Sequence, residues 1–160
     1  MGEGQELLAI IRVRGDVHVS ADIKDTLKHL RLNQVNHCSL VRKNQDYKGM
    51  LVKVNDYATW GEVDKKTLAK LLKKRGRMVG DKPLTDESLS GFGLKSVEEL
   101  ASALVDGGRK ISEFKGLKPV FRLNPPVGGH ARKGIKKNVK LGGSLGYRGK
   151  NINKLLEAMM

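Results

Sequence analysis

Basic side chains gather in a short stretch near the C-terminal end of the sequence, and phosphate is the group that such a stretch would bind. Glycines lie between them, so the backbone can approach a phosphate closely. If this cluster neutralised about six to ten phosphates, its affinity for nucleic acid would fall roughly 10³–10⁵-fold between 50 and 200 mM salt. The spacing predicts a nucleic-acid-binding segment that contains His130, Arg132, Lys133, Lys136, Lys137 and Lys140, followed by Arg148 and Lys150.

The excess positive charge of the chain is concentrated in the same place. The 160 residues include 31 Lys and Arg against 17 Asp and Glu, a formal net charge of +14. Residues 1–114 hold 20 basic and 16 acidic side chains, a net of +4, whereas residues 115–160 hold 11 basic and 1 acidic, a net of +10. A polyanion is the expected partner. A solvated flexible tail is the alternative, but apolar residues such as Phe121 and Leu141 favour a segment that becomes ordered against phosphates.

The aromatic residues indicate how the chain would recognise a nucleic acid. The chain has 7 aromatic residues, 1 Trp, 3 Tyr and 3 Phe, and they do not alternate with basic residues as in a sheet that stacks bases. The pattern therefore favours recognition of the shape and backbone of folded RNA.

Other kinds of site fit the sequence poorly. Residues 142–151 look like the phosphate loop of a nucleotide hydrolase, yet Ser144 stands where that motif needs glycine and Asn151 where it needs Ser or Thr. The four histidines and Cys38 show no spacing typical of a metal site, and Cys38 is expected to be a buried structural thiol. We expect no catalysis, no metal, no cofactor and no small-molecule substrate.

The expected compartment is the cytoplasm. No apolar run approaches the roughly 18 residues that a membrane span needs, so we expect no membrane contact. The N-terminal residues lack the pattern of a signal peptide. A single cysteine suits a reducing environment.

Alternating strands and helices are predicted ahead of the basic segment. The branched apolar run at 7–13 predicts a buried strand, and strands are also expected over 37–42 and 57–63. Ile23, Leu27 and Leu30 recur at i, i+4 and i+7, which predicts a helix beginning after Ser20.

Residues 47–54 fit two structures. Alternation of the apolar residues at 50, 52 and 54 would make a hairpin arm. Tyr47, Met50, Leu51 and Val54, however, have helical spacing, and Asp46 is available as a cap. We favour the helix.

Further helices are expected in the second half of the chain. One begins after Asp64 and ends at Gly76, a second has a capping box of Ser96 and Glu99, and a linker at 80–83 separates them. Residues 114–123 are expected to be extended. A closing helix is marked by Ile152, Leu155, Leu156 and Met159.

The predicted fold class is α+β, with three parts. Residues 5–63 form a β-α-β-α-β core domain, residues 64–115 a helical extension, and residues 116–160 a basic Gly-rich RNA-binding segment with its closing helix.

Several blocks of the sequence resemble the L-thirty family of large-subunit ribosomal proteins, called L-seven in eukaryotes. The long basic N-terminal extension of the eukaryotic form is not seen, so the archaeal long form fits better. The resemblance covers essentially the whole chain, through Leu8–Gly15, Asp22–Leu27, Val35–Val41, Tyr47–Met50, Val54–Tyr57, Arg122–His130 and Leu155–Met159.

This resemblance implies a core of three strands and two helices related to the ferredoxin-like class, with a helix over 47–54. It also implies a non-catalytic protein that binds ribosomal RNA in the large subunit, near 5S rRNA and beside other ribosomal proteins. The RNA-facing parts would be the strand end with Arg12 and Arg14, the helix start at Lys48, and residues 125–140; Arg122 is added for its charge. An RNA-binding module outside the ribosome, such as an RNA chaperone, is the alternative.

Overall fold

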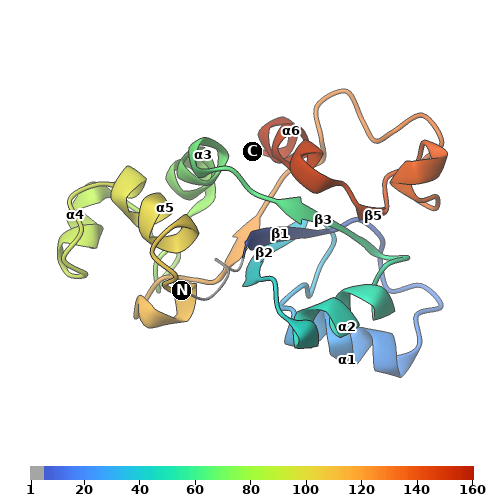
Figure 1. Ribbon diagram of the computed structural model, residues 1–160, viewed down its shortest axis with the longest axis horizontal. Helices are drawn as coiled ribbons and strands as arrows, with labels where there is room; N and C mark the ends of the chain where they lie inside the picture. Colours follow the sequence, from blue (N-terminus) through green and yellow to red (C-terminus); the bar gives the residue numbers. More distant parts are fainter. Residues whose placement is uncertain (1–5) are drawn as a thin grey trace.

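A five-stranded sheet separates two layers of helices in the computed structural model, which describes residues 6–160 (Figure 1). The strand order is β4-β2-β1-β3-β5, and every neighbouring pair is antiparallel except the parallel pair of β3 and β5. The strands are β1 (Leu7–Arg12), β2 (His37–Arg42), β3 (Ala58–Glu62), β4 (Val120–Arg122) and β5 (Gly146–Tyr147).

Strand β1 lies at the centre of the sheet, and its two faces serve two cores. Leu7, Ala9 and Ile11 belong to the larger core, whereas Leu8 and Ile10 belong to the smaller one. Because both faces of the strand are covered, its sequence is continuously apolar rather than alternating. The three predicted strands and the α+β class are confirmed.

The helices α1 (Ala21–His29) and α2 (Gln45–Lys53) cover the face that holds the smaller core (Figure 1). The helical interpretation of residues 47–54 is therefore confirmed. Its cap is Asn44 rather than Asp46, because the Asn44 side chain accepts a hydrogen bond from the Tyr47 N–H at 2.8 Å. Asp46 lies in the first turn instead, where its carboxylate faces the positive end of the helix dipole.

The helices α3 (Lys65–Arg75), α5 (Val97–Val105) and α6 (Ile152–Met159) lie on the other face, as Figure 1 shows. The Ser96 hydroxyl caps α5 as predicted, by accepting from the Glu99 N–H at 3.3 Å. The Glu99 carboxylate accepts from the Lys95 N–H, one residue earlier than a capping box requires.

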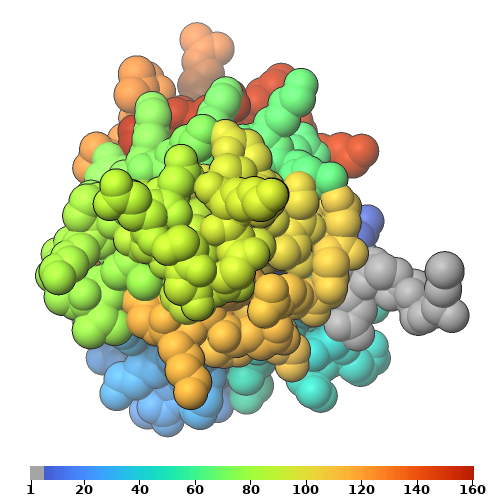
Figure 2. Space-filling view, turned by 90° about the vertical axis from the view of Figure 1, so that its left-hand side faces the viewer, coloured from blue at the N-terminus to red at the C-terminus, as the bar shows by residue number. Residues whose placement is uncertain are grey.

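Short elements complete the fold. The region of the predicted linker leads into a helix that the sequence analysis missed, α4 (Asp86–Ser90), capped by the Thr85 hydroxyl. Three 3₁₀ turns follow: η1 (Ile111–Glu113), η2 (Val139–Leu141) and η3 (Gly149–Asn151). Figure 2 shows the surface that α3 to α5, coloured green to yellow, form at one end of the molecule.

The C-terminal part of the chain contributes to the core as well as to the surface. Phe121 of β4 is fully buried. Ile152, Leu156 and Met159 of α6 belong to the same apolar cluster as Leu7 and Ile11 of β1, which are far from them in the sequence. Strands β4 and β5 form the two edges of the sheet. Residues from after position 115 are therefore integral to the fold.

Cys38 is expected to be chemically inert in the folded protein. It is fully buried in β2, and burial raises the pKa of its thiol to about 12. Because the thiolate is the reactive form, labelling at pH 8 should be about a thousandfold slower than for an unfolded chain. A thiol reagent such as DTNB, with and without denaturant, measures this ratio. Comparable rates in both conditions would contradict a closed core around β2.

Candidate nucleic-acid interface

The chain between β4 and β5 is fixed at its start to the end of α6. The Asn124 N–H donates to the Met159 carbonyl at 2.9 Å, and the Val127 N–H donates to the Ala158 carbonyl at 2.9 Å. Each bond supplies an N–H donor to a carbonyl near the C-terminal end of α6, which has no donor within the helix. The following residues leave the body of the protein from a defined point, at the upper right of Figure 1.

Residues 131–145, here called the basic loop, are closed by hydrogen bonds within the loop itself. The Ala131 N–H donates to the Ser144 hydroxyl at 3.2 Å. The N–H groups of Ser144 and Leu145 both donate to the Lys137 carbonyl, at 2.9 and 3.1 Å. These bonds give a glycine-rich segment a defined backbone path.

Closure of the basic loop needs glycine at position 143. A Cβ atom there would lie only 2.0 Å from the Lys137 carbonyl oxygen, so an alanine would push the two sides of the loop apart. We expect Gly143→Ala to lower RNA affinity severalfold at unchanged net charge, with little change in global stability. Filter binding and thermal unfolding measure the two quantities. Gly91→Ala, where the nearest atom would be 3.8 Å away, is the matched control; equal RNA affinity in both variants would contradict a shaped loop.

Thr59 and Arg148 tie the basic loop to β3. The Thr59 hydroxyl is fully buried, donates to the Gly146 carbonyl at 2.8 Å and accepts from Arg148 Nε at 2.8 Å. Arg148 Nη2 also donates to the Ser144 carbonyl at 3.0 Å. Burial lowers the pKa of Arg148, although arginine still remains charged at neutral pH. Arg148 thus links the end of the basic loop to β3.

The outer side of the basic loop carries five exposed cations. No Asp or Glu occurs in the sequence between Glu113 and Glu157, so no acidic neighbour from this stretch offsets them. Like charges held on a closed loop raise the local positive potential and attract phosphate groups. The five are Arg132, Lys133, Lys136, Lys137 and Lys140, and the exposed Lys150 of η3 follows them in the chain.

Arg12 is used inside the protein, and its burial argues against the predicted RNA contact. Its side chain is only 3% exposed. The guanidinium donates to the carbonyls of Leu32 and Arg14, both at 2.9 Å, and forms an ion pair with Asp16. That pair holds the pKa of the Asp16 carboxyl below its usual value. The charge of Arg12 therefore stabilises the turn after β1.

Three other predicted residues belong to elements outside the basic loop. Arg14 is half-buried, donates to the Asp56 carbonyl at 3.1 Å and lies over the Tyr57 ring, 5.1 Å from its centroid. Lys48 is exposed on α2, which covers the smaller core. Arg122 is exposed on β4, the sheet edge opposite β5.

His130 is a weaker candidate for a phosphate contact than the lysines and arginines. It is half-buried, and burial together with the charge of Arg148 lowers its pKa below the usual value. Its Nδ1 atom is buried and has no hydrogen-bond partner among residues 6–160. His130 is therefore protonated to a smaller extent at pH 7 than an ordinary histidine.

Tyr147 is a candidate contact that the sequence analysis missed. Its hydroxyl donates to the Glu62 carboxylate at 2.5 Å, which raises the pKa of the phenol to about 12. The side chain is 49% exposed and lies two residues after the basic loop, so its ring is available to stack on a base. Only the pairing of β5 with β3 reveals this placement.

Two other kinds of site receive no support from the part of the chain that the structure describes. Within it, no group of His, Cys, Asp and Glu side chains is arranged to hold a metal ion. No helix among the described residues has both the length and the apolarity to cross a membrane.

Comparison with known proteins identifies the family. The family model of ribosomal protein L30p/L7e matches residues 8–58. The large ribosomal subunit protein uL30 of Nanoarchaeum equitans is 53% identical over 150 residues, which cover 94% of this chain and 96% of that protein. The uL30 proteins of Methanococcus maripaludis and Methanopyrus kandleri are each 50% identical, over 95% and 92% of this chain and 98% and 100% of their own. The predicted resemblance is confirmed, and the chain belongs to the uL30 family of large ribosomal subunit proteins.

Proposed function

We propose that this protein is a non-catalytic structural component of the large ribosomal subunit and that it holds folded ribosomal RNA through its basic loop. The observation that carries the proposal is the set of five exposed cations on one closed loop, in a chain whose relatives are large-subunit proteins. Lys and Arg side chains on such a loop bind the phosphates of an RNA backbone.

The way in which the loop is built suits recognition of RNA shape. Its internal hydrogen bonds and the support from Arg148 fix the spacing of the cations, so less conformational entropy is lost when RNA binds. Phosphate contacts made in this way position a protein on RNA without reading its sequence. Tyr147, beside the loop, adds one aromatic surface for an unpaired base.

We also propose the partners of this protein: large-subunit ribosomal RNA close to 5S rRNA and the neighbouring ribosomal proteins, in the cytoplasm. Residues 6–115, together with β4, β5 and α6, form the body that positions the basic loop. We place the direct contacts at the five loop cations and Lys150, and we propose that Arg14, Lys48 and Arg122 contact separate RNA regions.

Sedimentation separates a ribosomal protein from a free RNA chaperone. A cell extract is run on a sucrose gradient, and the large-subunit fraction is then washed at moderately high salt. We expect the protein to co-migrate with the large subunit and to stay bound through the wash, because many contacts hold it in a folded RNA. Recovery at the top of the gradient, or complete release in the wash, would favour the chaperone.

A further inference from the structure

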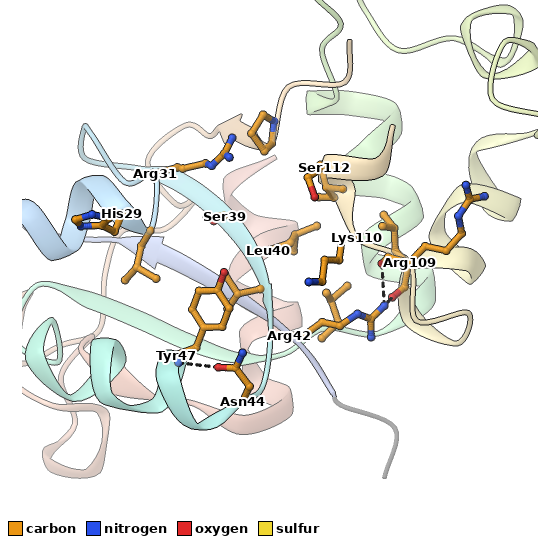
Figure 3. Close-up of a pocket in the computed structure, with 16 residues that line it drawn as sticks. His29, Arg31, Ser39, Leu40, Arg42, Asn44, Tyr47, Arg109, Lys110 and Ser112 are labelled. Atoms are coloured by element: carbon orange, nitrogen blue, oxygen red, sulfur yellow. Dashed lines mark hydrogen bonds between the residues drawn. The ribbon is translucent and has the colours of Figure 1, made fainter. Parts of the chain in front are cut away.

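A cavity of about 200 Å³ lies between β2 and the chain that follows α5 (Figure 3). The end of α1 and the start of α2 line one side of it, and residues 109–112 line the other. None of residues 131–145 lines this cavity, so it is separate from the basic loop.

The side formed by the chain after α5 is fixed to the edge of β2. Arg42 of β2 donates to the carbonyls of Leu104 and Arg109, the second at 2.9 Å. Arg109 in turn pairs with Glu113 at 3.3 Å and lies over the Phe114 ring, 4.6 Å from its centroid. The cavity is therefore a preformed space of limited size, and a ligand that fits it loses little binding energy to rearrangement of the protein.

The floor of the cavity is apolar and its size suits a small flat group. Leu30, Leu104 and Ile111, all buried, contribute to the lining. A volume of about 200 Å³ is smaller than the roughly 300–1,000 Å³ of a pocket for a drug-sized ligand, which leaves room for one nucleobase. The half-buried Tyr47 directs its hydroxyl into this space in Figure 3, where it can donate a hydrogen bond to the edge of a base.

The rim of the cavity is positively charged. Its lining contains no Asp or Glu among residues 6–160, and the basic residues in it are His29, Arg31, Arg42, Arg109 and Lys110. Arg42 and Arg109 hold the wall, whereas Arg31 and Lys110 are exposed. The Lys110 ammonium points into the cavity in Figure 3. An apolar floor beneath a cationic rim matches a nucleotide, whose base is flat and largely apolar on its faces and whose phosphate is anionic.

We propose that this cavity takes one unpaired nucleotide of the ribosomal RNA, with its base on the apolar floor beside the Tyr47 hydroxyl and its phosphate paired with Lys110 and Arg31. The inference rests on the proposed function, but it uses none of the residues of the basic loop. A base inside a duplex stays in the stack and cannot reach the floor, so the site selects a bulged or looped nucleotide.

Three RNA hairpins with the same stem test the proposal on the full-length protein. One is fully paired, one carries a single bulged adenosine and one a single bulged uridine. In amide NMR titrations, at least one bulged hairpin should shift the signals of residues 39–42 and 110–112, and it should bind roughly fivefold or more tightly than the paired hairpin. If neither bulged hairpin shifts these signals, or if all three bind equally, the proposal is wrong.

Charge reversal at the rim supplies a second readout. Lys110→Glu should reduce the preference for the bulged over the paired hairpin to less than about twofold, because the phosphate of the inserted nucleotide loses its partner. Lys82→Glu, an equal change at an exposed lysine outside the cavity, should leave the preference unchanged. The ratio of the two affinities cancels the effect of net charge on both hairpins. An equal loss of preference in both variants would overturn the assignment to this cavity.

Free nucleotides distinguish an RNA contact from a site for a small metabolite. Adenosine and uridine 5′-monophosphates are titrated in parallel, and tighter binding of either one than of both bulged hairpins at residues 39–42 would overturn the RNA assignment. Failure of the proposed function has a different signature, since none of the hairpins would then shift the signals of residues 131–145. The cavity signals and the loop signals are read separately in the same spectra.

Discussion

Replacing the five exposed cations of the basic loop with glutamine should remove most of the salt-dependent affinity for RNA. If each cation neutralises one phosphate, the five contacts together account for a roughly 10²–10³-fold fall in affinity between 50 and 200 mM salt. The variant should therefore bind weakly even at low salt, and its plot of log affinity against log salt should be flatter by about four. The substitutions are Arg132→Gln, Lys133→Gln, Lys136→Gln, Lys137→Gln and Lys140→Gln.

A control variant that loses the same charge elsewhere distinguishes the effect of the basic loop on RNA affinity from the effect of the net charge of the chain. Lys24, Lys28, Lys66, Lys74 and Lys82 are exposed on other surfaces, and their replacement by glutamine removes five positive charges without touching the loop. Filter binding of both variants to ribosomal RNA across a salt series gives the two slopes. Similar losses in both would mean that diffuse charge, rather than the loop, holds the RNA.

Phe121→Ala should be strongly destabilising, by about 3–5 kcal/mol, because a fully buried aromatic side chain is removed from the larger core. Phe121 pairs with Cys38 across the β2–β4 ladder, so the loss also loosens that edge of the sheet. Urea unfolding followed by circular dichroism measures the change in the free energy of unfolding.

Val127→Ala in the same part of the chain is the matched control for Phe121→Ala. Val127 is 85% exposed, so its truncation should change the free energy of unfolding by less than about 0.5 kcal/mol. If the two variants were equally stable, residues after position 115 would form a detachable tail rather than part of the fold.

The elements that could be predicted from the sequence are those with strong local patterns. The run at 7–13 and the stripe of Ile23, Leu27 and Leu30 each specify an element through side chains a few residues apart. The missed elements depend on distant partners or on very few residues. Strand β5 exists because Gly146 and Tyr147 meet Thr59 and Trp60 of β3, and α4 has only five residues.

The residues of the candidate interface also fall into two groups: those that the local sequence predicts and those that depend on distant contacts. Lysine and arginine side chains are usually exposed, and the five cations of the basic loop, which the sequence predicts as RNA contacts, are exposed in the structure. Arg12 and Arg148 have the same formal charge, but carbonyl and hydroxyl acceptors far away in the sequence hold them: the Leu32 carbonyl for Arg12 and the Thr59 hydroxyl for Arg148. The sequence shows the charge but not these acceptors.

Ultraviolet crosslinking of purified large subunits shows which residues of this protein lie against RNA. The irradiated subunits are digested with protease and nuclease, and mass spectrometry identifies the peptides of this protein that carry a nucleotide. We predict that residues 131–150, which hold the five cations, Tyr147 and Lys150, yield such peptides. Nucleotide-bearing peptides from other parts of this protein, with unmodified peptides recovered throughout residues 131–150, would show that the basic loop does not hold the RNA.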